Sequence, residues 1–184
     1  AQHCEVIGVD VSPQRVALLN ARKSPIGDQD LPDFLAAGDL TLSATTNLHE
    51  ALPGSDYVII ATPTNYDEKL NFFDTRSVED VAAECMEHAP EACLVIKSTI
   101  PVGFVDGLRS KLQSQNIFFS PEFLREGSAL HDNLNPSRII VGDQSEKAKI
   151  FAELLKSAAD SKEPTLLLTG TREAEAIKLF SNTY

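Results

Sequence analysis

The amino-acid sequence predicts an α/β fold with a doubly wound, mostly parallel sheet. Six short runs rich in Val, Ile and Leu lack the polar alternation of a half-exposed sheet, which indicates buried parallel strands. Segments with helical periodicity lie between these runs, and alternation of strand and helix is typical of α/β folds. The 184 residues contain no internal repeat or linker composition, so we expect one main domain.

The predicted elements follow one another along the chain. Strands are expected at 4–9, 57–61, 93–96, 117–119, 139–141 and 166–168, and helices at 13–22, 77–88, 102–113, 145–159 and 171–184. Ser12 and Pro13 mark a helix start, because Ser can cap free amides and Pro at the first helical position gives up no hydrogen bond. Two long connections, 62–76 and 120–137, follow strands, so we expect the ligand site at the carboxyl ends of those strands.

Composition argues against several classes of partner. The formal charge of −11 disfavours nucleic acids and acidic membranes, which need a clustered basic face. No apolar run approaches the roughly 18 residues that span a bilayer. The cysteines, Cys4, Cys85 and Cys93, lack CxxC spacing, which indicates neither a disulfide framework nor a metal site. Each lies in or beside an apolar stretch, so we expect buried structural thiols and a reducing, cytoplasmic compartment.

A carboxylate ends the first predicted strand. Dinucleotide-binding folds use an acid at this place to hold the adenosine ribose, so Asp10 is a candidate cofactor ligand, with an ordinary turn residue as the alternative. Its charge would repel a 2′-phosphate, which favours NAD over NADP. Arg15 could stack on the adenine or be a solvated surface charge. A glycine-rich phosphate loop should precede Asp10 by roughly 20 residues. No GxGxxG occurs, which fits a chain cut short before its first strand.

Polar loops follow the next strands. Thr62 and Thr64 flank a proline after the strand at 57–61 and could reach a ligand or cap a turn. Residues 97–103 expose the hydroxyls of Ser98 and Thr99 at a helix entrance, beside free amides that could hold an anion or a polarised water.

The stretch 120–127 is the most informative. It combines a base, an apolar wall and a possible phosphate clamp in one loop, from Glu122, Phe123, Leu124, Arg125 and Glu126. In the last helix, Lys178 and Asn182 are four residues apart and share a face. From the residues alone, an exposed lysine on an amphipathic helix is the favoured interpretation, and a catalytic pair is the alternative.

Seven segments, in this order, resemble the UDP-glucose 6-dehydrogenase family. They are VIGVD (6–10), SPI (24–26), DYVIIATPT (56–64), VIKSTIPVGF (95–104), FSPEFLREGSAL (119–130), NLNPSRIIVG (133–142) and EAEAIKLFSNTY (173–184). The resemblance runs through essentially the whole chain. It implies a Rossmann-like NAD-binding domain over 1–170, and a helix from 171 to 184 that begins the link to a second domain and helps form a homodimer.

The resemblance also implies a reaction and residue roles. The reaction is the NAD-dependent, four-electron oxidation of UDP-glucose to UDP-glucuronate, through a thioester on a cysteine beyond residue 184. The cofactor would be bound by Asp10, Arg15, Thr64, Thr99 and Glu126. The sugar nucleotide would be contacted by Glu122, Phe123, Leu124, Lys178 and Asn182. Thr99 and Glu122 would position or activate water, while Lys178 and Asn182 would stabilise the reacting oxygen.

Two departures from the family pattern predict that the chain is inactive by itself. The phosphate loop and first strand are missing, so NAD should bind poorly and a sheet edge or apolar groove should stay uncovered. No cysteine aligns with the nucleophile. The alternatives are a dehydrogenase for another nucleotide sugar, a two-electron β-hydroxyacid dehydrogenase, and a non-catalytic nucleotide-binding α/β domain. Clustering of Thr99, Glu122, Glu126 and Lys178 around one crevice would count against the last alternative.

Overall fold

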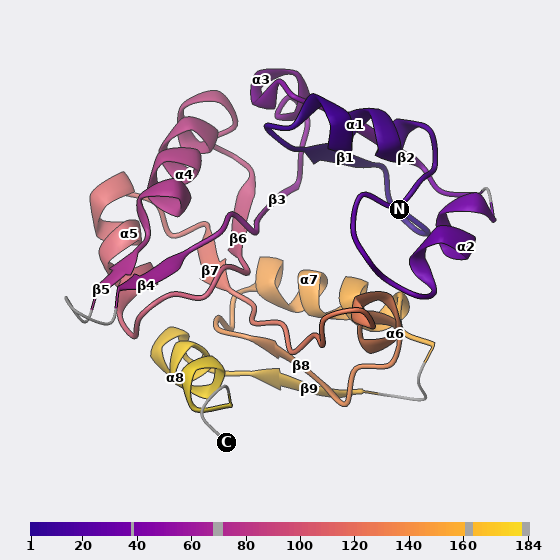
Figure 1. Ribbon diagram of the computed structural model, residues 1–184. Coiled ribbons are helices and arrows are strands. Elements are labelled where there is room, and N and C mark those ends of the chain that lie inside the picture. The colour runs from indigo at the N-terminus through magenta and orange to yellow at the C-terminus, as the bar shows by residue number, and fades with distance from the viewer. Residues whose placement is uncertain (38, 68–71, 161–163, 182–184) are drawn as a thin grey trace.

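The computed structural model describes residues 1–37, 39–67, 72–160 and 164–181, in which strands and helices alternate (Figure 1). The strands are β1 (Val6–Val9), β2 (Leu42–Thr45), β3 (Tyr57–Ile60), β4 (Asn65–Asp67), β5 (Phe72–Asp74), β6 (Cys93–Ile96), β7 (Ile117–Phe119), β8 (Arg138–Val141) and β9 (Thr165–Leu168). The helices are α1 (Pro13–Asn20), α2 (Leu31–Ala36), α3 (Leu48–Ala51), α4 (Arg76–His88), α5 (Phe104–Leu112), α6 (Ala129–Leu134), α7 (Glu146–Ser157) and α8 (Thr171–Ser181).

Parallel pairing organises the sheet. The strands β3, β6 and β7 are neighbours, with Ile60 beside Ile96 and Ile96 beside Phe119. A backbone bond from Gly142 N to Phe119 O (2.8 Å) brings the end of β8 to β7, and β8 pairs in parallel with β9. β1 pairs in parallel with β2, whereas β4 and β5 are antiparallel. The predicted α/β architecture with a parallel sheet is therefore confirmed.

Side chains of the central strands alternate between two cores, one on each face of the sheet. Leu94 and Ile96 of β6 lie in the core that α4, α5 and α8 cover, whereas Cys93 and Val95 lie in the core against α7. Every residue of β6 is buried. Helices on both faces of a parallel sheet explain why these strands are apolar throughout rather than alternating.

Two helix starts follow from their sequences. Ser12 is extended (φ −90°, ψ 110°), its hydroxyl accepts a hydrogen bond from Arg15 N at 3.4 Å, and Pro13 takes the first helical position, as predicted. In the same way, Ser145 accepts from Ala148 N at 3.3 Å at the start of α7. None of the helices that the structure describes combines the length and apolar character needed to cross a lipid bilayer.

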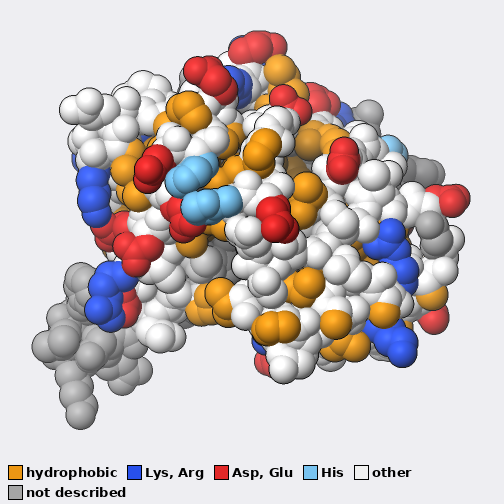
Figure 2. Space-filling model, turned by 90° about the horizontal axis from the view of Figure 1, so that it is seen from above, with side chains coloured by type: hydrophobic (Ala, Val, Ile, Leu, Met, Phe, Trp, Pro, Cys, Tyr) orange, Lys and Arg blue, Asp and Glu red, His pale blue; other side chains and the backbone are white. Residues whose placement is uncertain are grey.

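The first strand is much more exposed than its apolar sequence predicts. Val6, Ile7 and Val9 are 37%, 39% and 42% exposed, because β2 is the only described strand that pairs with β1. Ile59 of β3 is also exposed (52%). Figure 2 shows apolar side chains reaching the surface on the face seen from above, with basic side chains in small separate groups. Apolar side chains of β1 and β3 therefore lie at the surface of the described residues.

The prediction of buried thiols holds for Cys85 and Cys93 and is wrong for Cys4, which is exposed. Cys4 lies before β1 begins at Val6, where no core covers the chain. Burial raises the pKa of Cys85 and of Cys93 to about 11, so both thiols stay protonated at neutral pH and are inert as nucleophiles.

Candidate functional site

The strand register brings two predicted site loops to the same edge of the sheet. Ile96 of β6 lies beside Phe119 of β7, and both strands run in the same direction. Thr99 lies three residues after Ile96, and Glu122 lies three residues after Phe119. The two side chains therefore emerge from neighbouring loops at the carboxyl edge, where open α/β sheets bind ligands.

Hydrogen bonds join the loop after β3 to the loop after β6. The Thr64 hydroxyl donates to the Thr99 carbonyl at 2.8 Å, and the Ser98 hydroxyl donates to the Thr62 carbonyl at 2.6 Å. The two cofactor-binding candidates Thr64 and Thr99 thus lie together. The Thr99 hydroxyl itself makes no hydrogen bond with any residue that the structure describes, so it can serve a ligand or a water.

Lys178 reaches across from α8 to the loop after β7. Its Nζ donates to the backbone carbonyl of Glu122 at 2.5 Å and lies 5.3 Å from the ring centroid of Phe123. Burial lowers the pKa of Lys178, whereas the charge of Glu122 raises it. A half-buried ammonium beside a backbone carbonyl and an aromatic ring, with a carboxylate within electrostatic range, can bind a ligand oxygen that carries negative charge.

A second lysine, which the sequence analysis did not single out as a site residue, faces the same loop. Lys97 directly follows β6, and its Nζ donates to the Ser120 carbonyl at 3.3 Å. Burial lowers the pKa of Lys97; Glu122 opposes this effect and Lys178 adds to it. Glu122 therefore lies within the electrostatic range of two ammonium groups. A lysine placed immediately after a fully apolar strand was the signal that could have identified it.

An ion pair and buried hydrogen bonds hold the C-terminal end of the loop that carries Glu122. Arg125, expected as a phosphate clamp, forms an ion pair with Asp132 of α6 at 2.6 Å. This pairing lowers the pKa of Asp132 to about 2. The buried carboxylate of Asp28, from the loop before α2, accepts the amide of Leu130 at 3.0 Å and that of Leu31 at 2.9 Å. The 24–31 segment thus holds the start of α6 in place.

The remaining predicted site residues make fewer contacts with the rest of the proposed site. Leu124 is half-buried, whereas Glu126 is exposed and forms no ion pair with a described residue. Asn182 lies outside the described residues. Of the four residues expected around one crevice, Glu122 and Lys178 are in direct contact, and Thr99 lies on the neighbouring loop. Glu126 forms no hydrogen bond or ion pair with these three described residues.

Asp10 and Arg15 form a separate pair at the start of α1. The Asp10 carboxylate accepts the Ser12 amide at 2.8 Å and the Arg15 guanidinium at 3.3 Å. Both side chains are partly open to solvent, at 30% for Asp10 and 56% for Arg15. Asp10 therefore stabilises the turn before α1, which was the alternative to a cofactor ligand. Its carboxylate can still accept hydrogen bonds from the hydroxyls of a ribose.

The free amides expected at the entrance of α5 are already used. Glu175 of α8 accepts from Gly103 N at 2.6 Å and from Val105 N at 2.9 Å. The anion at this helix start is thus a side chain of the protein, and the Gly103 and Val105 amides are not free for a bound anion, contrary to the expectation. Sequence reasoning missed Glu175, because its partners lie seventy residues earlier.

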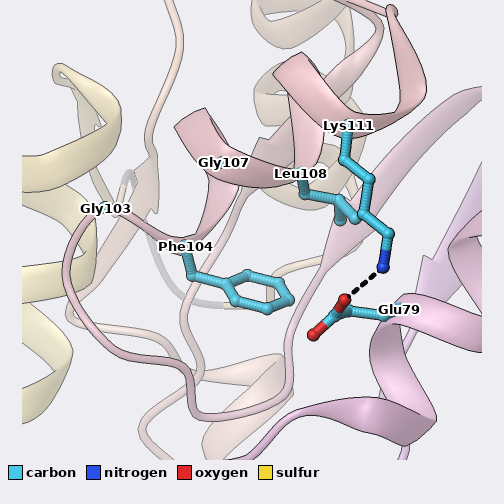
Figure 3. Close-up of a pocket in the computed structure, with 6 residues that line it drawn as sticks. All are labelled: Glu79, Gly103, Phe104, Gly107, Leu108 and Lys111. Atoms are coloured by element: carbon cyan, nitrogen blue, oxygen red, sulfur yellow. Dashed lines mark hydrogen bonds and ion pairs between the residues drawn. The ribbon is translucent and has the colours of Figure 1, made fainter.

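One cavity of about 290 Å³ lies between α4 and α5, apart from these residues. Its lining consists of Glu79, Gly103, Phe104, Gly107, Leu108 and Lys111 (Figure 3). Lys111 and Glu79 bridge it with an ion pair of 2.6 Å. None of the predicted site residues lines this cavity. Among the described residues, no group of three or more His, Cys, Asp or Glu side chains is arranged to hold a metal ion.

Comparison with known proteins gives consistent matches. A protein named UDP-glucose 6-dehydrogenase from Campylobacter jejuni is 44% identical over 180 residues, which cover 98% of this chain and 46% of that protein. Its namesake from Streptococcus pneumoniae is 48% identical over 190 residues, which cover 100% of this chain and 48% of that protein. The chain thus spans about half the length of the curated relatives it matches.

Solved structures agree with the sequence matches. A UDP-glucose dehydrogenase from Pyrobaculum islandicum superposes with a TM-score of 0.80 at 32% identity, over 97% of this chain and 43% of that one. A GDP-mannose dehydrogenase from Pseudomonas aeruginosa gives 0.84 at 27% identity, over 98% of this chain and 44% of that one. The sequence model that matches residues 1–158 describes the NAD binding domain of the UDP-glucose/GDP-mannose dehydrogenase family. The chain therefore belongs to the UDP-glucose/GDP-mannose dehydrogenase family and forms its NAD-binding domain, as the sequence predicted.

Proposed function

We propose that the protein carrying this chain oxidises UDP-glucose to UDP-glucuronate, with NAD as the oxidant. One observation carries the proposal: Lys178 meets the Glu122 loop at the carboxyl edge of the sheet, beside the loop of Thr99. Relatives named UDP-glucose 6-dehydrogenase, at 44% and 48% identity, support this substrate.

The chain's own residues suggest a division of labour. The Lys178 ammonium stabilises negative charge that develops on the sugar C6 oxygen, because a half-buried cation acts there with little solvent screening. Glu122 and Thr99 position a water for the second half of the oxidation, and Glu122 can accept its proton. Phe123 and Leu124 supply an apolar wall to the sugar nucleotide, and Asn182 is proposed to hold the reacting oxygen together with Lys178.

The residues of this chain fit the adenosine end of NAD. Asp10 retains acceptor sites for ribose hydroxyls, Arg15 lies one helical turn on, and the negative charge of Asp10 disfavours a 2′-phosphate. Thr64 and Thr99 are proposed for the cofactor's other end, with Glu126 near the nicotinamide. NAD supplies hydride acceptance when bound, whereas the protein groups named here bind, orient and move protons.

Two parts of the proposal concern groups outside these residues. We propose that a thioester forms on a cysteine that follows residue 184. Cys85 and Cys93 are buried thiols with a pKa of about 11, and the exposed Cys4 lies before β1 rather than on the loops of the proposed site. We also propose that a preceding strand and glycine-rich loop cover the exposed apolar side chains of β1 and β3 and cradle the pyrophosphate. Residues 1–184 by themselves should then be inactive. A homodimer, a cytoplasmic location and a linking role for α8 stay predictions.

The test is a comparison of substrates with the full protein that contains this chain. NADH formation should be much faster with UDP-glucose than with GDP-mannose or UDP-N-acetylmannosamine, and faster with NAD than with NADP. Preference for GDP-mannose would favour the other nucleotide-sugar branch. Binding of nucleotide sugar without any NADH formation would favour a non-catalytic nucleotide-binding domain.

A further inference from the structure

We propose that Glu175 is a positioning residue: it fastens α8 to the N-terminal end of α5 and thereby holds Lys178 over the Glu122 loop. This inference rests on the proposed function for the role of Lys178. It concerns a carboxylate that does not itself reach the site, so its effect on the reaction would be indirect.

The geometry of Glu175 is that of a helix cap supplied from another helix. The side chain is fully buried (0% exposed). One carboxylate oxygen accepts the amide of Gly103 at 2.6 Å, and the other accepts the amide of Val105 at 2.9 Å. The first amides of a helix have no partner within the helix, and a carboxylate there also interacts favourably with the helix dipole.

The sequence at the start of α5 explains why the cap must come from elsewhere. The residue at the N-cap position is Gly103, which has a positive φ of 89° and no side chain that could accept a hydrogen bond. Ser, Thr, Asp and Asn are the residues that usually cap these amides locally. Glu175 supplies both acceptors from 72 and 70 residues further along the chain.

Burying this carboxylate has a cost that the local contacts oppose. Burial raises the pKa of Glu175, whereas the amides of Val105 and Gly103 lower it. An apolar side chain in the same place would avoid the cost of burial and would leave two amides unpaired. The buried Glu175 carboxylate therefore links α8 to α5 through specific hydrogen bonds, which non-specific apolar packing would not replace.

The hydrogen bonds of Glu175 connect the two parts of the proposed site, which are the Thr99 loop and the Lys178 side chain. Thr99 lies four residues before Gly103, on the loop that leads into α5. Lys178 lies three residues after Glu175, so the two are neighbours on α8. Lys178 then reaches the Glu122 carbonyl. One carboxylate thus sets the position of the lysine-bearing helix relative to the threonine-bearing loop.

A matched control joins the same two helices without entering the core. Arg172 of α8 pairs with Asp106 of α5 at 2.7 Å, and the two side chains are 68% and 41% exposed. If any α5–α8 contact served equally well, Arg172→Gln and Glu175→Gln would have similar effects. We expect only Glu175→Gln to displace Lys178, because glutamine offers one acceptor oxygen and turns an N–H₂ group towards the second amide.

The first measurement is independent of activity. In the full protein, the acylation rate of Lys178 by an N-hydroxysuccinimide ester would be followed by mass spectrometry. Glu175→Gln should raise this rate several-fold, Glu175→Asp should raise it less, and Arg172→Gln should leave it unchanged. Equal labelling of Lys178 in all variants would overturn the proposal. Failure of both Glu175 variants to fold would also overturn it, in favour of a purely structural role.

The second measurement asks whether Glu175 acts through Lys178. Displacement by about 1 Å can reduce a rate on the order of a hundredfold, so kcat in Glu175→Gln should fall between tenfold and a hundredfold. Combined with Lys178→Ala, Glu175→Gln should add almost no further loss. Full additivity of the two losses would contradict the proposal. If the wild-type protein oxidises no nucleotide sugar, the proposed function fails, while the labelling comparison still decides the role of Glu175.

Discussion

Replacing Arg109 with methionine tests how much its buried contacts, which link α5 to β7 and to Asp143, stabilise the fold around the site. In α5, the Arg109 side chain donates from Nε to the Ile117 carbonyl of β7 at 2.7 Å. It also donates from Nη2 to the carboxylate of Asp143 at 2.5 Å. The side chains of Arg109 and Asp143 are only 14% and 17% exposed. Arg109→Met should therefore remove a buried donor from the Ile117 carbonyl and the charged partner from the Asp143 carboxylate, at a place with little access to water.

The magnitude follows from this burial. Breaking a buried ion pair by removing one partner costs about 3–5 kcal/mol in the free energy of unfolding. Asp143 keeps the bond from the Ser145 amide at 2.7 Å, so we expect the lower end, about 3 kcal/mol. The exposed pair between Arg172 and Asp106 gives the contrast, because exposed pairs contribute at most about 1 kcal/mol.

The effect of Arg109→Met should depend on pH. Burial raises the pKa of Asp143, but Ser145 and the Arg109 guanidinium outweigh it, so the pKa lies below its ordinary value of 3.8. A lowered carboxyl pKa gives a stabilisation that is present above that ordinary value and is lost as the pH falls below it. The difference between wild type and Arg109→Met should therefore shrink below about pH 4.

Hydrogen–deuterium exchange of the slowest β6 and β7 amides in the full protein measures this difference. At neutral pH, about 3 kcal/mol corresponds to exchange roughly a hundredfold faster in Arg109→Met. Arg172→Met should accelerate exchange by about fivefold or less. Equal acceleration in the two variants, or a difference that persists unchanged at pH 3, would contradict a stabilising ion pair between Arg109 and Asp143.

Two further predictions concern close packing and thiol chemistry. Gly142→Ala should destabilise the fold by about 1–3 kcal/mol in urea unfolding, because the added Cβ would lie 2.8 Å from the Cβ of an alanine in α8; Gly107→Ala, with no atom within 4 Å, should be neutral or stabilising. At pH 8, a maleimide should label Cys4 rapidly and Cys85 and Cys93 only after unfolding, because burial raises the pKa of the latter two to about 11. Comparable labelling rates for the three thiols would contradict the burial described here.

The strands that the sequence predicted best are those with a neighbour or helix on every side. β6 and β7 are continuous apolar runs because both of their faces are buried, and such runs can be recognised from the sequence alone. β2 (Leu42–Thr45) was missed, because its sequence, LSAT, is half polar and β1 is the only described strand that pairs with it. α2, α3, α6 and the β4–β5 pair were missed as well, because they are too short to show a period.

The site could be predicted where it depends on strand ends and not where it depends on long-range contacts. Thr99 and Glu122 follow directly from two recognisable strands. Glu175 could not be found in this way, because its partners are backbone amides seventy residues away and no local pattern marks them. The exposure of β1 was mispredicted for a related reason, since burial of a strand depends on neighbours that its own sequence does not contain.

The number of NADH molecules formed for each UDP-glucose consumed by the full protein decides whether it carries out a four-electron oxidation. We expect two, because the site is proposed to oxidise the C6 alcohol to a carboxylate in two successive steps. A ratio of one would mean a two-electron alcohol dehydrogenase and would contradict the roles proposed for Glu122 and Thr99 in positioning water. No NADH, with UDP-glucose still bound, would contradict the assignment of a dehydrogenase activity altogether.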